Sequence, residues 1–186
     1  MELLSKSNSK LRKDGIVSFG LPAGKTCPFA GECRSFCYAA KGCYRFSSIE
    51  KAQNKRFLVT RTKQFVQAMS DECQPGGIVR IHDSGDFYSK AYLDKWVEIA
   101  THNPYTYFYA YTKSVQYFLG RTMPKNFRVI FSFGGKDDHM IDTRRDYHAV
   151  IFKDKAALDA AGYADSSESD LVAARGRIRR IGLIAH

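Results

Sequence analysis

Apolar residues gather in six short runs along the chain, each bordered by glycine, proline or charged residues. Runs of this length, rich in aliphatic and aromatic side chains, are typical of buried strands. They predict strands over residues 15–22, 76–83, 105–112, 127–135, 147–153 and 177–186.

Helical periodicity separates several of these runs. Residues 47–72 predict one long helix, whose start has the Ser47–Glu50 spacing of a capping box. In residues 89–103, apolar side chains recur three and four positions apart and predict a second helix. The remaining segments predict a short helix and a loop, over residues 113–120 and 159–170.

This alternation sets the expected fold class. Strands that alternate with helices imply a parallel sheet with right-handed crossovers. We therefore expect an α/β fold, a partial (β/α)6 barrel of mostly parallel strands with helices outside. A chain of 186 residues suits one domain, so residues 1–186 are expected to form a single domain.

Residues with distinctive chemistry follow the predicted strands directly. Cysteines follow the first strand, and three further motifs follow the next strands, at residues 82–87, 112–114 and 132–135. Parallel sheets carry their sites at the carboxyl ends of the strands. The sequence therefore predicts that these motifs meet at one edge of the sheet.

Composition adds a strong positive charge to this outline. The formal net charge is +10 and the pI is near 9.4, which favours nucleic acid as a partner; a basic surface without a dedicated ligand is the alternative. No apolar run is long enough to span a membrane, and the first residues lack the apolar middle of a signal peptide. We expect a cytoplasmic protein in a reducing compartment.

Four of the five cysteines lie within residues 24–46, hereafter the cysteine loop. Cys27, Cys33 and Cys37 are spaced C-x5-C-x3-C, and Cys43 follows. The odd count and the reducing compartment disfavour disulfides and favour metal binding or catalysis. Positive side chains that can offset thiolate charge flank them, namely Lys25, Arg34, Lys41 and Arg45.

Three interpretations of the loop stay open. A structural zinc site would use all four cysteines, although such sites usually pair two short, well-separated knuckles. Free thiols without a metal are the second interpretation. The third is a [4Fe–4S] cluster held by Cys27, Cys33 and Cys37, because a long irregular loop with glycines can wrap a cubane. Three protein ligands would leave one iron open to an external ligand.

Several other residues have two interpretations each. The carboxylate of Asp86 can accept from a ligand ammonium group, or Asp86 or Ser89 can cap the helix that follows. Lys113 can neutralise a ligand anion or lie at the surface. The tyrosines of one strand face form core packing or a stacking surface: Tyr105, Tyr107, Tyr109 and Tyr111.

The remaining histidines and the fifth cysteine complete the candidates. His82 is expected in the core, or as a proton donor. His148 and His186 are candidates for a fourth cluster ligand. Cys73 stands apart from the loop and is expected to be inert.

Three close cysteines after the first strand of a β/α array resemble the radical S-adenosylmethionine (SAM) superfamily. Its usual spacing is C-x3-C-x2-C with an aromatic residue before the last cysteine, the position of Phe36 here. In that superfamily SAM chelates the fourth iron, and an electron donor drives its cleavage to a deoxyadenosyl radical. The resemblance implies that the following residues contact the cofactors: Phe36, Tyr38, Ser84, Gly85, Asp86, Lys113, Ser132 and Gly134.

A closer resemblance is to a family of phage and plasmid proteins called gene product 88-like, which implies a location in the cytoplasm of a bacterial host. The similar stretches are "GIVSFGLPAGKTCP", "CRSFCYAAKG", "RIHDSGDFYS", "YAYTKS", "FSFGGKDD" and "IGLIAH". This resemblance supports the expected fold and the expected cluster more than it supports any particular reaction. A non-catalytic cluster protein for electron transfer, redox sensing or nucleic-acid binding is therefore the second hypothesis, and a zinc-bound nucleic-acid module is the third.

Overall fold

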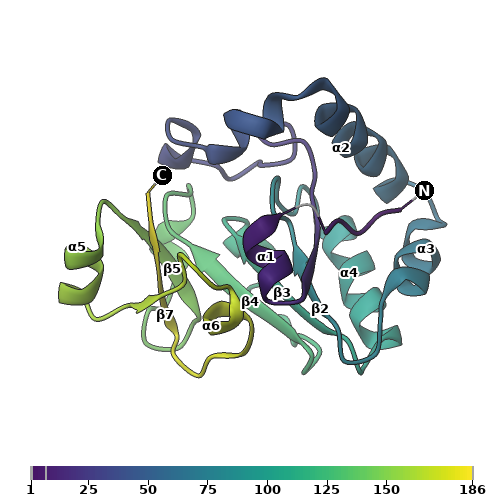
Figure 1. Cartoon of the computed structure of the whole chain (residues 1–186). Coiled ribbons are helices and arrows are strands. Elements are labelled where there is room, and N and C mark those ends of the chain that lie inside the picture. Colours follow the sequence, from purple (N-terminus) through teal and green to yellow (C-terminus); the bar gives the residue numbers. More distant parts are fainter. Residues whose placement is uncertain (1, 7, 186) are drawn as a thin grey trace.

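One sheet of seven strands forms the centre of the computed structural model, which describes residues 2–6 and 8–185. The strand order is β1-β2-β3-β4-β5-β7-β6, and all neighbouring pairs are parallel. The sheet curls into a half-barrel (Figure 1). The strands are β1 Ile16–Phe19, β2 Ile78–Ile81, β3 Tyr107–Thr112, β4 Phe127–Ser132, β5 His148–Phe152, β6 Ala164–Asp165 and β7 Arg180–Ile184.

The predicted α/β class and the parallel strands are confirmed, and each of the six predicted strands contains an observed one. The sheet has one strand more than expected, because β6 lies inside the predicted loop 159–170. This strand has two residues and pairs with β7 through its backbone. It is too short to contain an apolar run, which is the signal that predicts a strand. The structure is a half-barrel, and the finer (β/α)6 radical SAM-like barrel stays a prediction.

Two helices, α3 (Phe65–Glu72) and α4 (Lys90–His102), cover the outer face of the sheet. Trp96 of α4 is fully buried there, among Phe19, Phe65 and Phe108. The hydroxyl of Ser89 accepts from the amide of Tyr92 at 3.2 Å and caps α4, the role predicted as the alternative for this serine.

The predicted helix over residues 47–72 is broken in two, because α2 ends at Thr60 before α3 begins. Lys95 of α4 donates to the carbonyls of Thr60 and Thr62 at 2.7 and 2.8 Å. These bonds satisfy carbonyls that the helix end leaves without partners, and they stabilise the turn between α2 and α3. The predicted capping box is wrong, since α2 (Ser47–Thr60) begins without a side-chain cap.

Short helices were not evident from the sequence. They are α1 (Ser9–Lys13), α5 (Lys155–Ala160) and α6 (Leu171–Arg175). The short helix that was predicted, over residues 113–120, is a 3₁₀ turn at Val115–Tyr117. Such lengths are too short for an apolar period. None of the helices formed by residues 2–6 and 8–185 combines the length and apolar character that a membrane span needs.

The inner face of the sheet is covered by α1 and α6 (Figure 1). Tyr107, Tyr109 and Tyr111 face this side and pack around Ile130 and Ile181, which makes the expected core packing correct for these three. Tyr105 precedes the strand and is 80% exposed. The inner face is therefore both aromatic and polar.

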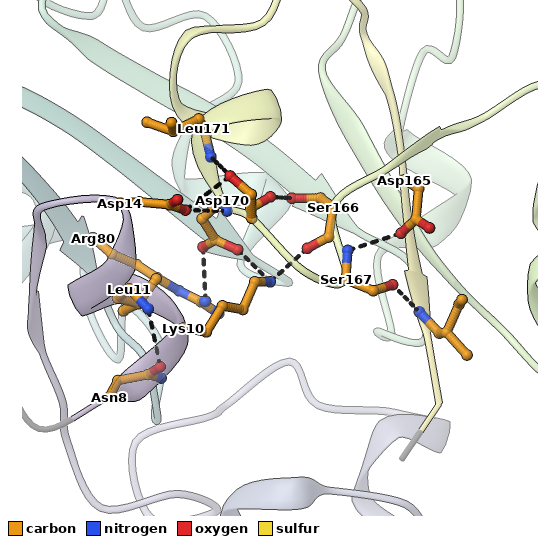
Figure 2. Close-up of polar contacts among 12 residues, drawn as sticks. Asn8, Lys10, Leu11, Asp14, Arg80, Asp165, Ser166, Ser167, Asp170 and Leu171 are labelled. Carbon is orange, nitrogen blue, oxygen red and sulfur yellow. Dashed lines mark hydrogen bonds and ion pairs between the residues drawn. The ribbon is translucent and has the colours of Figure 1, made fainter.

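A buried carboxylate organises the polar part of the inner face (Figure 2). Asp170 forms an ion pair with Lys10 Nζ at 2.5 Å and accepts from Arg80 Nη1 at 2.9 Å. It also accepts from the Tyr109 hydroxyl at 2.6 Å. Its side chain is fully buried. Burial alone would raise the pKa of Asp170, but the charges of Arg80 and Lys10 outweigh it and hold the pKa below its usual range.

One edge strand of the sheet is paired with a residue near the start of the chain, and the other edge strand is short. At the β1 edge, Ser5 forms an antiparallel bridge with Ser18, through backbone bonds of 2.7 and 2.9 Å. At the other edge lies β6 with its two residues. Away from these edges, the buried carboxylate of Asp170 joins α1, β2, β3 and the start of α6.

Asp170→Asn is expected to destabilise the protein by about 3 kcal/mol at pH 7, because it leaves two largely buried cations without their counter-charge. Urea unfolding followed by circular dichroism measures this loss. Asp165→Asn is the matched control, since Asp165 lies near the surface and bonds the amide of Ser167. Its change is expected to stay within about 0.5 kcal/mol.

The pH dependence has a definite sign. Because the folded pKa of Asp170 is lowered, its stabilisation is present above the unfolded pKa of about 3.9 and is lost as pH falls through the folded value. The stability gap between wild type and Asp170→Asn should shrink below about pH 4. A gap that stays constant down to that range would contradict the ion-pair origin.

Candidate functional site

A cavity of about 160 Å³ lies at the carboxyl edge of the sheet, between the cysteine loop and the loops that follow β2, β3 and β4. Ten of the eleven predicted site residues line it: Cys27, Cys33, Phe36, Cys37, Tyr38, Ser84, Gly85, Asp86, Lys113 and Ser132. Their convergence agrees with the general location of sites in parallel sheets. The contact roles assigned to them stay predictions.

The cysteines divide into two groups. Cys27, Cys33 and Cys37 are partly buried and line the cavity together. Cys43 is exposed and lies outside the lining. Cys73 is buried in the outer core, where its thiol donates to the carbonyl of Met69 at 3.3 Å. Only the three-cysteine set predicted for a cluster shares one cavity.

The surroundings of Cys27 and Cys33 favour the neutral form of these two thiols. Burial, followed by the charge of Asp86, raises the pKa of Cys27 to about 11. Burial also raises the pKa of Cys33, although the charge of Lys113 acts against it. A bound cationic centre would be needed to make these groups thiolates at neutral pH.

The cysteine loop is anchored by the loop after β4. The carbonyl of Gly134 accepts from the amides of Gly31 and Cys33, both at 3.2 Å, and the amide of Lys136 donates to Phe29 at 2.9 Å. The amide of Gly134 in turn donates to Asp138 at 2.8 Å. Gly134 lies outside the cavity lining, and its observed contacts fix the position of Cys33.

Gly85 lets the loop after β2 approach the cysteine loop. Its φ is +82°, a conformation that favours glycine, and a Cβ there would lie 2.5 Å from Thr26 Oγ1 and 2.7 Å from Leu21 Cβ. Thr26 directly precedes the first cysteine. Gly85 therefore sets how closely Cys27 lies to the end of β2.

Ser84 and Asp86 are both engaged by protein groups. Ser84 Oγ donates to the carbonyl of Leu21 at 2.9 Å and accepts from Gln53 Nε2 at 2.7 Å. Asp86 accepts from the amides of Phe87 and Lys113 and from the Thr112 hydroxyl, at 2.6–2.8 Å. Burial raises the pKa of Asp86 above its ordinary value, although these hydrogen bonds offset part of the rise. Asp86 thus joins the ends of β2 and β3 and does not cap α4.

Lys113 extends across the cavity to the end of β4. Its Nζ donates to Ser132 Oγ at 2.7 Å, to the Ser132 carbonyl at 3.2 Å and to the Phe133 carbonyl at 3.0 Å. Within the described part of the chain it forms no ion pair. Its three donor positions are taken by neutral oxygens, while its positive charge acts on the nearby Asp86 and Cys33.

Two aromatic residues of the cysteine loop form the outer wall. Phe36 is 46% exposed, and Tyr38 is 51% exposed although its hydroxyl reaches inward and donates to the carbonyl of Asp83. This hydrogen bond ties the loop to the end of β2. The two rings separate the cavity from solvent on that side.

Of the two candidate histidines that the structure describes, His82 is among the residues that line the cavity and His148 is not. His82 packs in the outer core against Phe87, its Nε2 lies 2.9 Å from the Tyr92 hydroxyl, and burial lowers its pKa to about 3. It is neutral at physiological pH, as expected of a core histidine. His148 was wrongly considered as a cluster ligand, because it begins β5 at the opposite edge and bonds Asp146 and Tyr163. His186 lies outside the described residues.

Nine lining residues were not predicted as site residues, and four of these nine belong to the inner face of the sheet: Arg80, Tyr111, Ile151 and Leu183. They lie on strands and close the cavity from the inner face. Arg80 carried a usable signal, because a charge within the strand "IVRI" of a parallel sheet requires a buried partner. That partner is Asp170, so the cavity floor rests on the buried ion pairs.

Among residues 2–6 and 8–185, no three histidine, cysteine or acidic side chains surround one point closely enough for a single metal ion. A zinc ion needs its ligands within about 2.3 Å of one centre. Cysteines of a cubane bind different irons and are spread around a larger object. The three thiols that line the cavity are soft donors of the kind that both zinc and iron–sulfur clusters take.

Fold and site together define an α/β protein with a cysteine-lined cavity at the carboxyl edge of a parallel half-barrel. A family model described as Gene product 88 matches residues 2–184, and the chain belongs to this family. No solved structure matches the chain.

One relative is the Gene 88 protein of Mycobacterium phage L5, which is 30% identical to this chain over 116 residues. The alignment covers 52% of this chain and 47% of the phage protein, so it spans about half the length of each. The predicted membership of the gene product 88-like family is confirmed. The relation to radical SAM proteins remains a prediction.

Gly85→Ala is expected to lower the free energy of unfolding by about 3 kcal/mol, from the left-handed backbone and the overpacking against Thr26. Gly42→Ala is the matched control, because Gly42 also lies in the cysteine loop with φ of +57° but has open space around its Cβ position. It should cost about 1 kcal/mol. Equal losses in urea unfolding would contradict the proposed close approach.

Proposed function

We propose that this chain binds a [4Fe–4S] cluster through Cys27, Cys33 and Cys37. The observation that carries the proposal is that these three thiols, and no other cysteine, line one cavity at the carboxyl edge of the sheet. When bound, the cluster supplies one-electron redox chemistry and an iron with an open coordination site. An electron donor is then a required partner.

The surroundings of the cavity support an anionic cluster. A cubane with three thiolates carries negative charge, and Lys113 offers a cation without an ion-pair partner beside Cys33. The cysteine loop adds Arg34, Lys41 and Arg45 at its surface. These charges stabilise thiolates that burial alone would keep protonated.

Anaerobic reconstitution with iron and sulfide is expected to give a brown protein with about four irons and four sulfides per chain. Alanine at Cys27, Cys33 or Cys37 should reduce bound iron about tenfold or more, because ligand loss outweighs the effects of outer contacts. Cys43→Ala is the matched control from the same loop and should keep its iron. A colourless zinc-loaded protein, or loss of iron only in Cys43→Ala, would overturn the proposal.

For the fourth iron we propose SAM as the ligand. Beyond the thiols, the cavity presents Lys113 for a carboxylate, and Ser132 with its carbonyl for hydroxyl or ammonium groups. Phe36 and Tyr38 offer apolar surface for an adenosine moiety. This finer step rests on the cluster and on the resemblance of the cysteine motif to the radical SAM superfamily.

Reconstituted protein given SAM and dithionite is expected to release 5′-deoxyadenosine and methionine. A cluster reduced by dithionite would supply one electron to the sulfonium, which would break the C5′–S bond. The resulting 5′-deoxyadenosyl radical would take a hydrogen atom from a C–H bond of a buffer or protein group. Lys113→Met should raise the SAM concentration for half-maximal product about tenfold, which is about 1.4 kcal/mol. Iron content serves as the control and should not change. A cluster-bearing protein that yields no 5′-deoxyadenosine would exclude SAM cleavage while leaving cluster binding intact.

One observation favours a second candidate, a non-catalytic cluster protein for electron transfer or redox sensing. Ser84 and Asp86, the residues expected to contact the SAM amino group, are already bonded to Leu21, Gln53, Thr112 and backbone amides. Under this alternative, the cluster shows reversible reduction without SAM turnover.

A further inference from the structure

A dense group of arginines lies at the amino edge of the sheet, opposite the cysteine loop. Six are exposed, on the segments that lead into β5 and β7, and we call them the arginine rim: Arg144, Arg145, Arg175, Arg177, Arg179 and Arg180. Figure 1 shows the cysteine loop and α2 along the top of the sheet and α6 near its lower end. The rim and the cavity are therefore separated by the length of the strands, about 16 Å.

Side-chain stacking holds the segments of the rim together. Arg128 of β4 donates to the carbonyls of Ala173 and Gly176 at 2.9 and 2.8 Å, which fixes α6 and the turn after it. The same guanidinium lies 4.5 Å from the ring centre of Tyr147, and Arg179 lies 5.9 Å from it. The rim is thus a built surface formed by segments far apart in sequence.

The rim has much more positive than negative charge. Two acids, Asp142 and Asp146, lie on the segment that carries Arg144 and Arg145. Asp142 forms an ion pair of 3.6 Å with Arg145, and no other rim arginine has an ion pair among the described residues. Such excess charge on one edge accounts for part of the net charge of +10.

We propose that the arginine rim binds the phosphate backbone of nucleic acid without reading its sequence. Guanidinium groups match phosphate oxygens with two parallel hydrogen bonds, and this cluster consists of arginine alone. Membrane attachment would also require apolar side chains to insert, and residues 175–180 contain one large exposed apolar side chain, Ile178. The proposal goes beyond cluster binding and does not depend on it.

The test uses the full-length protein and a labelled short DNA duplex of mixed sequence, with binding followed by fluorescence anisotropy against salt concentration. The variant Arg144→Gln/Arg175→Gln/Arg177→Gln removes three exposed charges that lie outside the Tyr147 stack. Its affinity at about 0.1 M salt should fall at least about tenfold, and its slope of log K against log salt should decrease by about 2.7.

Lys51→Gln/Lys55→Gln/Lys63→Gln is the matched control, because it removes the same charge from exposed positions on and after α2, away from the rim. Its affinity should change less than about twofold. Unchanged thermal melting of both variants verifies folding. Equal losses in the two variants, absence of salt-dependent DNA binding, or tighter binding to phosphatidylserine vesicles than to DNA would overturn the proposal. Cluster content, measured on the same samples, should not change.

Discussion

The cysteine loop depends on a few polar contacts with the strand ends, because it has almost no core of its own. It contains short 3₁₀ turns joined by irregular segments, and Thr26 and Ala30 are its buried residues. The carbonyl of Gly134 binds two of its amides, Tyr38 reaches the end of β2, and Gly85 allows the close approach of Thr26. A loop with so little buried apolar surface gains its shape from these anchors and from whatever it binds.

The anchors in turn require a polar inner face beneath them. Arg80 forms part of the cavity floor, and a guanidinium at this depth is tolerated because Asp170 neutralises it. Lys10 and Tyr109 complete the set, which draws α1 and the start of α6 onto the sheet. Ion pairing on the inner face and thiol placement at the carboxyl edge are therefore parts of one arrangement.

The sequence was most informative where the period of side chains is strong or where chemistry follows a strand. All six predicted strands exist, and ten predicted site residues meet at one cavity, because parallel strands bring their carboxyl ends together. The break at Thr60 could not be read locally, because Lys95, which binds the carbonyls there, belongs to another helix. The sequence did not predict β6 or α6, because both depend on contacts with distant residues. β6 pairs with β7 through its backbone, and Asp170 at the start of α6 forms an ion pair with Arg80.

The two edges of the half-barrel limit its pairing with strands of other molecules. An open parallel sheet exposes unpaired backbone groups that can template the strand of another molecule. Here Ser5 forms an antiparallel bridge with Ser18 of β1, and the far side ends in a strand too short to template a neighbour. The incomplete barrel is thereby protected against strand exchange and fibrillar stacking, although its curvature never closes.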